Sequence, residues 1–502
     1  MLTLADESCS SWAQRTFGHA DLGDRRRSRR LVLLAKAAAA SPAGKITQVC
    51  LTDAERQGAY GWIDSDQFST SRVVQAAAQA TVALSQPHPF VYVPVDQTSV
   101  RLTDRQRRKD FGPIGKGEKT RGLQVMTAVG VDPDGTPLGL CGQQWWAQRP
   151  YHFSHAELSK GRRLKGPRSR QLRKDLKRRD RRRAKSRRNR RRAFADKEPF
   201  RWLQVARQVC AAFEHRDNAA CVWPWLQCDR GADNQDVLVA FAALPMWFTV
   251  RAKYNRCLDD DTLLRERLAA QPVLTTFLLE VPARKKRPAR VAKMVVRKAQ
   301  VTLQMRHKNS DRVRNLTLWV VQAQEVDVPA DQHGVNWTLL TNYPVQDEAS
   351  CALVLEGYAT RWRIEEMHRM WKRGGCHVED TELRTLERVR RWGTVLTTVA
   401  IRSTRLAYLA RENPEQPADT EFSQDEIDAA ILLRRPAGWQ PGQKPSLSQM
   451  VRWVADEGGY TGKSSGGPPG ATVVKRGLVR VTAAAEVLAE ARKLGMTLVR
   501  EM

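Results

Sequence analysis

Acidic residues follow two stretches of the sequence that are expected to be buried strands. Asp96 comes directly after the apolar run 91–95, and Asp229 comes directly after the run 226–228. Ligands collect at strand ends in α/β sheets, so both aspartates could hold a cation there. A single Asp after a strand is more often a turn residue that accepts backbone hydrogen bonds, so the pair is informative only if the two strands are neighbours.

A third carboxylate lies in a segment that also carries Tyr, Arg and Lys. The segment reads Tyr358-x2-Arg361-x3-Glu365-x6-Lys372. On one continuous α-helix these residues would fall within a sector of about 60°. A surface helix with a solvated polar face would show the same pattern, so the spacing alone leaves both interpretations open. In the chemical interpretation, the carboxylate ligates a divalent cation while its neighbours hold phosphate oxygens.

If Asp96, Asp229 and Glu365 converge, they would suit Mg²⁺ or Mn²⁺, hard cations that prefer oxygen ligands. Two such ions, roughly 3.5–4 Å apart, activate an attacking oxygen and stabilise the leaving one. A glycosidase also uses paired carboxylates, but it has no need for neighbouring Arg and Lys or for a basic chain. The three carboxylates therefore predict metal-assisted phosphoryl transfer.

The charge balance of the chain points to nucleic acid. Its 502 residues include 84 Lys and Arg against 54 Asp and Glu, a net charge of +30. Cations that neutralise phosphates gain affinity from counterion release. More than half of the excess lies in a basic arm at 160–195, which has too few apolar residues to bury. We expect that arm to be a solvated helix or a disordered segment that binds phosphates without sequence preference.

Composition excludes membrane-embedded and wholly disordered proteins. The chain has 41% hydrophobic and 27% charged residues, and no apolar run approaches the ~18 residues of a membrane span. Residues 1–12 lack the pattern of a signal peptide, so we expect a cytoplasmic protein. The nine cysteines form no C-x-x-C, which favours reduced thiols over disulfides or a zinc ribbon.

Hydrophobic periodicity divides the chain into five parts. Between residues 90 and 252 the expected order is βββαβαβ, which predicts a mixed α/β core. The full division is a helical domain at 1–80, the first part of the core at 81–252 with the basic arm inside it, a β-strand insertion at 253–341, further core helices at 342–412 and a helical C-terminal region at 413–502.

The expected N-terminal helical domain carries a group of arginines. Asp24 suits a helix N-cap, which would place Arg26, Arg27 and Arg30 on one face of the helix that follows. Such a helix could enter or flank a DNA groove. A solvated helix face is an equally good interpretation of these residues alone.

These residues resemble the DDE transposases of bacterial insertion sequences, in particular the insertion sequence four group and, within it, the transposon five type. The spacing of Tyr358, Arg361, Glu365 and Lys372 is that of the group's Y-R-E-K signature at every step. The resemblance runs nearly from end to end and includes Trp12-Ala13, Leu22-Gly23-Asp24, Gly58-Ala59-Tyr60, Asp96-x-Thr98-Ser99, Gln144-Trp145-Trp146, Cys228-Asp229-Arg230-x-Ala232-Asp233, Val250-Arg251-x-Lys253, Trp337-x-Leu339-Leu340-Thr341 and Arg361-Trp362-Arg363-Ile364-Glu365-Glu366.

The resemblance implies a ribonuclease-H-like catalytic core, with a β-strand insertion domain and flanking helical domains that bind transposon ends and dimerise. It implies that Asp96, Asp229 and Glu365 are catalytic and hold two Mg²⁺ or Mn²⁺ ions. Further catalytic residues implied are Tyr358, Arg361 and Lys372, and the DNA-binding residues implied are Trp337, Trp362, Arg251, Lys253, Arg256, Arg26, Arg27 and Arg30.

In such enzymes water cleaves the transposon end, the freed 3′-hydroxyl closes a hairpin on the opposite strand, a second water opens it, and the 3′-hydroxyl attacks target DNA. Closing the hairpin requires a base to leave the stack, and Trp337 matches the tryptophan that receives it. A buried core residue is the alternative for Trp337. We therefore expect a cut-and-paste transposase that acts as a homodimer on double-stranded DNA, in the bacterial cytoplasm and on the nucleoid.

Three other functions fit parts of the sequence. A catalytically silent DNA-binding regulator would not need the three carboxylates and the whole signature. A ribonuclease-H-like nuclease without strand transfer would have no use for the hairpin tryptophan or a dimerising tail. A basic RNA-binding protein would need none of these features.

Overall fold

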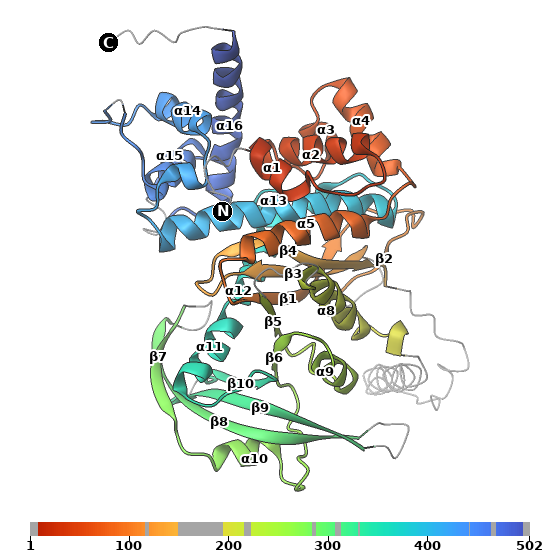
Figure 1. Cartoon of the computed structure of the whole chain (residues 1–502), viewed down its shortest axis with the longest axis vertical. Coiled ribbons are helices and arrows are strands. Elements are labelled where there is room, and N and C mark those ends of the chain that lie inside the picture. The colour runs from red at the N-terminus through yellow and green to blue at the C-terminus, as the bar shows by residue number, and fades with distance from the viewer. Residues whose placement is uncertain are drawn as a thin grey trace, which may run out of the picture.

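The chain folds as a mixed α/β protein around one large sheet, with most of its helices gathered at one end (Figure 1). The computed structural model describes residues 9–115, 120–148, 194–214, 222–283, 288–306, 313–329, 332–440, 442–462 and 468–494. The basic arm predicted at 160–195 lies almost entirely outside these residues.

The sheet begins with an antiparallel part and continues with a parallel part. Strands β1 (Phe90–Arg101), β3 (Arg121–Val131) and β4 (Pro137–Trp146) pair antiparallel, and the short β2 (Gly112–Pro113) lies beside β3. Strands β5 (Trp223–Cys228) and β6 (Trp247–Arg251) follow on the other side of β1, parallel to it. Helices α8 (Phe200–Phe213) and α9 (Gln235–Ala242) stand before and after β5 in the chain. Apart from β2, this is the predicted order βββαβαβ.

The predicted β-rich insertion is present and extends the same sheet. It contains α10 (Leu264–Ala269), β7 (Thr275–Val281), β8 (Arg290–Arg306), β9 (Val313–Val326) and β10 (Asn336–Thr341). Because β10 pairs antiparallel with β6, the order across the sheet is β2-β3-β1-β5-β6-β10-β9-β8-β7. The insertion is thus joined to the core by backbone hydrogen bonds.

The segment 358–372 is not the single helix assumed from its spacing. Helix α11 (Glu348–Ala359) ends at a tight turn, α12 (Trp362–Arg369) starts after it, and a π-helical turn η2 (Met370–Gly374) follows. The turn forms because the backbone N–H groups of Arg361 and Arg363 donate to the carbonyls three residues earlier, those of Tyr358 and Thr360. The π turn shifts the angular position of the side chains that follow it. The sector of about 60° expected for one continuous α-helix therefore does not apply to these residues.

Helices form the upper layer above β4. The N-terminal helices are α1 (Cys9–Phe17), α2 (Arg25–Ala40), α3 (Ile46–Val49), α4 (Asp53–Asp64) and α5 (Thr70–Ser85), and α5 lies beside the long α13 (Leu386–Glu412) across the sheet (Figure 1). The C-terminal helices α14 (Gln424–Arg434), α15 (Leu447–Glu457) and α16 (Ala471–Lys493) share a core with the end of α13. This agrees with the predicted helical character of both ends.

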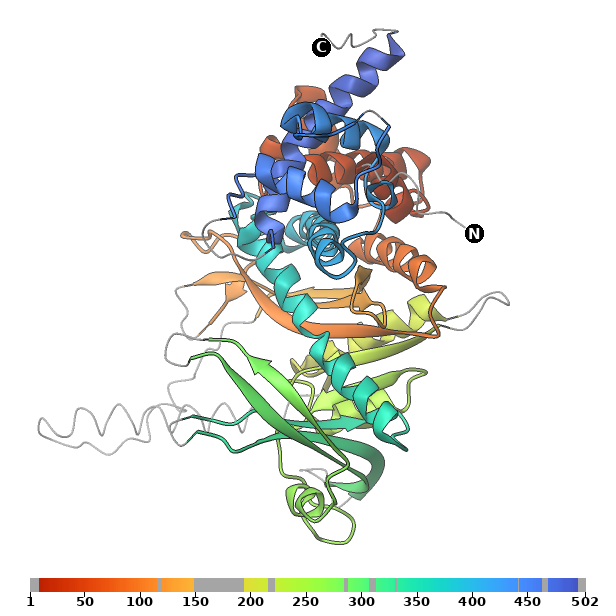
Figure 2. The same cartoon turned by 90° about the vertical axis from the view of Figure 1, so that its left-hand side faces the viewer.

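The sheet separates two hydrophobic cores. Tyr92 of β1 and Trp225 of β5 belong to the core that includes α11, α12 and α13, whereas Val91 and Leu226 belong to the core that includes α8 and α9. Figure 2 shows α11 and α12 as a teal, diagonal pair of helices along the first of these faces. Since side chains alternate along a strand, residues two positions apart in β1 or in β5 point toward the same core.

Two further findings concern the cysteines and the helices of the described residues. Their eight cysteines are free thiols. Within the described part of the chain, no helix combines the length and the apolar character that crossing a membrane would require.

Candidate active site

The two aspartates lie side by side at one level of the sheet. In the parallel pairing of β1 and β5, Val95 is the partner of Cys228, and Asp96 and Asp229 each come one residue later. Strand β1 does not end at residue 95 as predicted but continues to Arg101, because β3 goes on pairing with it after β5 stops. Asp96 is therefore a mid-strand residue beside the end of its neighbour.

Both aspartates occupy the face of the sheet that α11 and α12 cover. Tyr92 lies four residues before Asp96 and is bound to α11, since its hydroxyl donates to the carbonyl of Leu353 at 3.0 Å. Trp225 lies four residues before Asp229 in the same core. By the alternation of strand side chains, Asp96 and Asp229 point to that side.

Arg361 connects this pair to the predicted third carboxylate. Its Nη1 lies 3.8 Å from Asp96 Oδ2, and its Nη2 donates to Glu365 Oε1 at 2.5 Å. Burial raises the pKa of Asp96 to about 6; Arg361 opposes the shift, and the negative charges of Asp229 and Glu365 add to it. Asp229 and Glu365 are thus both within electrostatic reach of Asp96, and the shared role predicted for the three acids remains a prediction.

The chemistry of these three acids fits a hard divalent cation, whereas their present arrangement does not. Carboxylate oxygens are what Mg²⁺ and Mn²⁺ select, and the mutual repulsion felt by Asp96 is what a cation would relieve. Among the described residues, however, no three His, Cys, Asp or Glu side chains are grouped closely enough to hold an ion as they stand. The guanidinium of Arg361 lies between Asp96 and Glu365 instead.

Lys372 reaches the same sheet face from the π turn. Its Nζ donates to Thr98 Oγ1, two residues beyond Asp96 on β1. Burial lowers the pKa of Lys372, while the nearby Glu379 raises it. Lys372 also borders a groove whose other lining residues are Ser99, His368, Arg369, Arg373 and Glu379.

Tyr358 and Trp337 pack on one another beside the carboxylates. Tyr358 is buried at the end of α11, and the ring of Trp337 meets it edge-on with centroids 5.6 Å apart. Trp337 is half-buried on β10, two residues before Leu339, which pairs with Arg251 of β6. Trp337 thus packs on the core and keeps an exposed portion, and its predicted contact with a displaced base remains a prediction.

Arg251 and Asp229 are neighbours in the sheet. Cys228 pairs with Val250, so each of the two residues comes one position after this pair, on the same face. Arg251 Nη2 donates to the carbonyl of Asn336 at 2.7 Å, and its Nε is a buried nitrogen without a partner in the structure.

Lys253, Arg256 and Trp362 differ in their availability to DNA. Lys253 is exposed, and Trp362, at the start of α12, is 47% exposed. Arg256 is 13% exposed and pairs with the fully buried carboxylate of Asp233. The structure thus gives Arg256 an internal partner, and its predicted contact with DNA remains a prediction.

The N-terminal arginines lie apart from the carboxylates, in the helical layer (Figure 1). Asp24 is the expected N-cap of α2, with Oδ1 accepting from the N–H of Arg26 at 2.7 Å. Arg26 is exposed, but Arg27 donates back to the carbonyl of Leu22 and the guanidinium of Arg30 packs against Gly58 of α4. The three side chains therefore do not form one equally exposed face.

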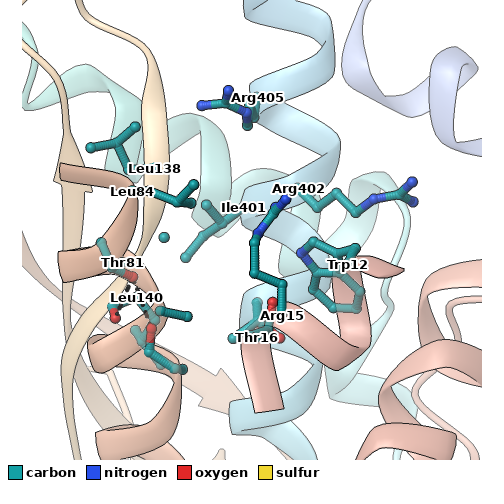
Figure 3. A pocket seen from close by; sticks show the side chains of 14 residues that line it. Trp12, Arg15, Thr16, Thr81, Leu84, Leu138, Leu140, Ile401, Arg402 and Arg405 are labelled. Carbon is teal, nitrogen blue, oxygen red and sulfur yellow. Dashed lines mark hydrogen bonds between the residues drawn. The ribbon is translucent and has the colours of Figure 1, made fainter. Parts of the chain in front are cut away.

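A pocket outside this site lies between α1, α5, β4 and α13 (Figure 3). Arg402 in its wall is fully buried and donates to Cys9 Sγ at 3.3 Å, and Arg405 pairs with Glu421 at 2.7 Å. Burial, together with Arg405 and Arg402, lowers the pKa of Arg15 to about 10. These charges join the N-terminal helices to α13, and none of the predicted site residues lines the pocket.

Comparison with known proteins identifies both ends of the chain. Residues 9–68 match the family described as transposase DNA-binding, and residues 398–497 match the transposase Tn5 dimerisation domain. These matches confirm the predicted DNA-binding and dimerisation domains and, at the C-terminal end, the resemblance to the transposon five type. The second match begins inside α13, before the boundary at 413 expected from sequence.

A solved structure of the piggyBac transposase synaptic complex with hairpin DNA is also similar, with 10% identity over 100% of this chain and 84% of that chain. Its TM-score of 0.29 is too low to carry an argument about fold or function.

Sequence reasoning missed two residues at the site. Thr98 belongs to the motif Asp96-x-Thr98-Ser99, but nothing in the sequence indicates that it is the partner of Lys372. His368 was not singled out, although it stands one helical turn after Glu365, a spacing that puts both on one side of α12. It is buried, and its Nε2 has no partner in the structure.

Proposed function

We propose that this chain is a cut-and-paste DNA transposase of the DDE type. It binds transposon ends, cleaves them through a DNA hairpin and joins the freed 3′-hydroxyl to target DNA. The observation that carries the proposal is that Asp96 and Asp229 lie side by side on one sheet face and that Arg361 joins Asp96 to Glu365, in a chain with a transposase DNA-binding domain and a Tn5 dimerisation domain.

The strand order supports a ribonuclease-H-like core. Three antiparallel strands, β4, β3 and β1, are followed by two parallel ones, β5 and β6. The acids stand on the central β1 and directly after β5, where parallel strands end and ligands gather. The β-strand insertion and the Y-R-E-K spacing support membership of the insertion sequence four group.

Mg²⁺ or Mn²⁺ is the proposed cofactor, as two ions held by Asp96, Asp229 and Glu365. Such ions supply Lewis-acid polarisation of the phosphate and a nucleophilic oxygen at neutral pH. Arg361 pairs with Asp96 and Glu365 in the DNA-free chain, and in the complex its guanidinium would be available to phosphate oxygens, for which it is a good bidentate partner.

The remaining residues would bind and orient the DNA. Lys372, positioned by Thr98, would hold a phosphate next to the reacting one. Trp337 would receive a base that leaves the stack, with Tyr358 supporting its ring from the side. Arg251, the sheet neighbour of Asp229, would contact the strand at the same edge.

The proposed partners are the transposon's inverted-repeat ends, target DNA and a second copy of the chain in a synaptic complex. Its proposed location is the bacterial cytoplasm, on the nucleoid when bound to DNA. The second candidate is a catalytically silent DNA-binding regulator, which the same DNA-binding domain would serve equally well.

Cleavage of labelled duplexes that carry the inverted repeats flanking the gene separates these two functions. The intact chain is compared with Asp96→Ala, Asp229→Ala and Glu365→Ala in Mg²⁺ or Mn²⁺. A matched control is Glu366→Ala, which removes the adjacent acid that pairs with Arg363 instead.

Metal-dependent nicks followed by hairpins are expected for the intact chain and the control. All three active-site variants should bind the duplex and cleave nothing. Tight binding without cleavage by every version would favour the silent regulator, and the catalytic roles would be withdrawn.

A further inference from the structure

The loop that follows β6 presents a large aromatic side chain to solvent. Tyr254 is 51% exposed, in a structure where most large hydrophobic residues are buried. None of the predicted roles involves this residue. An exposed aromatic ring near a site for nucleic acid is a candidate stacking surface, provided that the loop holds it in place.

A buried carboxylate holds this loop in one shape. Asp233 is fully buried and accepts from the backbone N–H of Lys253 at 2.6 Å and of Tyr254 at 3.1 Å. It also accepts from Arg256 Nε at 3.1 Å. On the outer side, Asn255 Oδ1 accepts from the N–H of Arg265 at 2.9 Å. These hydrogen bonds hold the loop in one conformation, in which the Tyr254 ring is exposed.

Two cations stand at the ring. Arg256 Cζ lies 5.5 Å and Lys253 Nζ 5.3 Å from its centroid. Asp233 fixes the position of the Arg256 guanidinium, so the guanidinium stays next to the Tyr254 ring. Lys253 is exposed and can turn toward a phosphate. An aromatic face flanked by cations is the chemistry that binds single-stranded nucleic acid, since the base stacks while the backbone is neutralised.

The loop leaves the sheet at the edge where the carboxylates lie. Cys228, before Asp229, pairs with Val250 of β6, and Ala252 donates to the carbonyl of Thr338 at 2.8 Å. Thr338 follows Trp337 in β10. Tyr254 thus lies in the loop that follows β6 at the edge of the sheet where β5 ends at Cys228 and β10 begins at Asn336.

We propose that Tyr254 is a stacking platform for an unpaired base of the DNA strand that enters the active site. The inference rests on the proposed function and adds to it a second aromatic contact besides Trp337. Closing a hairpin at a DNA end takes bases near the reacting phosphate out of the stack, and a displaced base needs a surface to receive it.

Fluorescence anisotropy with two probes tests the role of Tyr254 in the full chain. The probes are a fluorescein-labelled oligothymidylate and a mixed-sequence duplex, each titrated with Tyr254→Leu, Tyr254→Phe and intact protein. Tyr460→Leu is the matched control, because Tyr460 also lies against an arginine, Arg452 at 4.6 Å, in the C-terminal helical region.

Tyr254→Leu should weaken oligothymidylate binding roughly tenfold, in line with the loss of one base–aromatic stack. Tyr254→Phe and the control should bind the oligothymidylate like the intact chain, and duplex binding should not change in any variant. Thermal unfolding confirms that each variant is folded.

Equal affinity of Tyr254→Leu and intact protein for oligothymidylate would overturn the stacking role while leaving the proposed function standing. A parallel loss of duplex affinity would overturn it as well, since that result indicates a general contact. If the intact chain bound neither probe, the proposed function itself would fail and the stacking role with it.

Discussion

Lys372 donates a hydrogen bond to Thr98, which ties the π turn after α12 to the strand that carries Asp96. The contact depends on the extra residue that the π turn inserts, since π-helical turns shift the phase of the side chains that follow. Such turns occur frequently at functional sites. The hydrogen bond therefore links the position of the Lys372 ammonium group to that of the Asp96 carboxylate, two residues before Thr98 on β1.

Thr98→Val should slow end cleavage roughly tenfold without weakening DNA binding, because hydrogen bonds to charged groups contribute about 1.5–3 kcal/mol. The valine keeps the shape of the strand residue, and Thr98→Ser should restore the rate. Single-turnover cleavage measures both. In a double-mutant cycle, Thr98→Val should add nothing to Lys372→Met. Additive losses would show that Thr98 acts independently of Lys372.

Arg361→Met should raise the affinity of the DNA-free chain for Mn²⁺ roughly tenfold, because a positive charge close to two carboxylates opposes the binding of a cation. Titration followed by electron paramagnetic resonance gives the affinity directly. Arg363→Met is the control, since Arg363 pairs with Glu366 and lies 4.1 Å from the ring of Tyr408. Unchanged or weaker Mn²⁺ binding in Arg361→Met would contradict the proposed metal site.

His368 should make the protein less stable in mild acid. Burial lowers its pKa from 6.5 to about 3, and the charges of Lys372 and Arg361 act in the same direction. Below pH 6.5 the unfolded chain takes up a proton that the folded chain refuses, so stability is complete above that pH and declines as the pH falls toward 3. Between pH 7 and 5 the intact chain should lose about 2 kcal/mol more than His368→Gln.

Chemical denaturation at the two pH values measures that difference for His368. The comparison isolates the histidine, because all other titrating groups are common to both proteins. Identical losses in the two proteins would show that the imidazole is protonated in the folded state.

Arg391 should be critical for the attachment of the N-terminal helices to α13. Its guanidinium, 4% exposed, donates to the carbonyls of Ile63, Ser65 and Phe68 at the end of α4 and lies 4.5 Å from the Phe68 ring. Arg391→Met should cost about 3 kcal/mol or more, because buried carbonyls would lose their donors.

Denaturant unfolding and limited proteolysis between α4 and α5 check this role of Arg391. Arg388→Met is the matched control, because its partly exposed pair with Asp64 should contribute about 0–1 kcal/mol. Equal stability of the two variants would exclude a special role for Arg391.

Deleting the basic arm at 160–195 should reduce the salt dependence of DNA binding. Each phosphate contact contributes about 0.9 to the slope of log K against log salt, so the loss of several contacts is measurable. Titrations of one duplex at several salt concentrations give the slope for both proteins. An unchanged slope would exclude the arm from DNA contact.

The sequence by itself determined the parts of this protein that depend on local patterning. The order βββαβαβ, the β-rich insertion and the helical ends follow from periodicity, which each element carries in its own residues. The N-cap at Asp24 is equally local. The two end domains were also identified correctly, because their residues resemble those of known transposases.

Tertiary structure alone decided how the site is assembled. The sequence could not show that β3 extends β1 past Asp96, that β10 joins the insertion to β6, or that α12 turns into a π-helix before Lys372. Each of these depends on pairing or packing between segments far apart in the chain. The position of Arg361 between Asp96 and Glu365 is of the same kind, since electrostatic contacts form only once the strand and the helix are packed together.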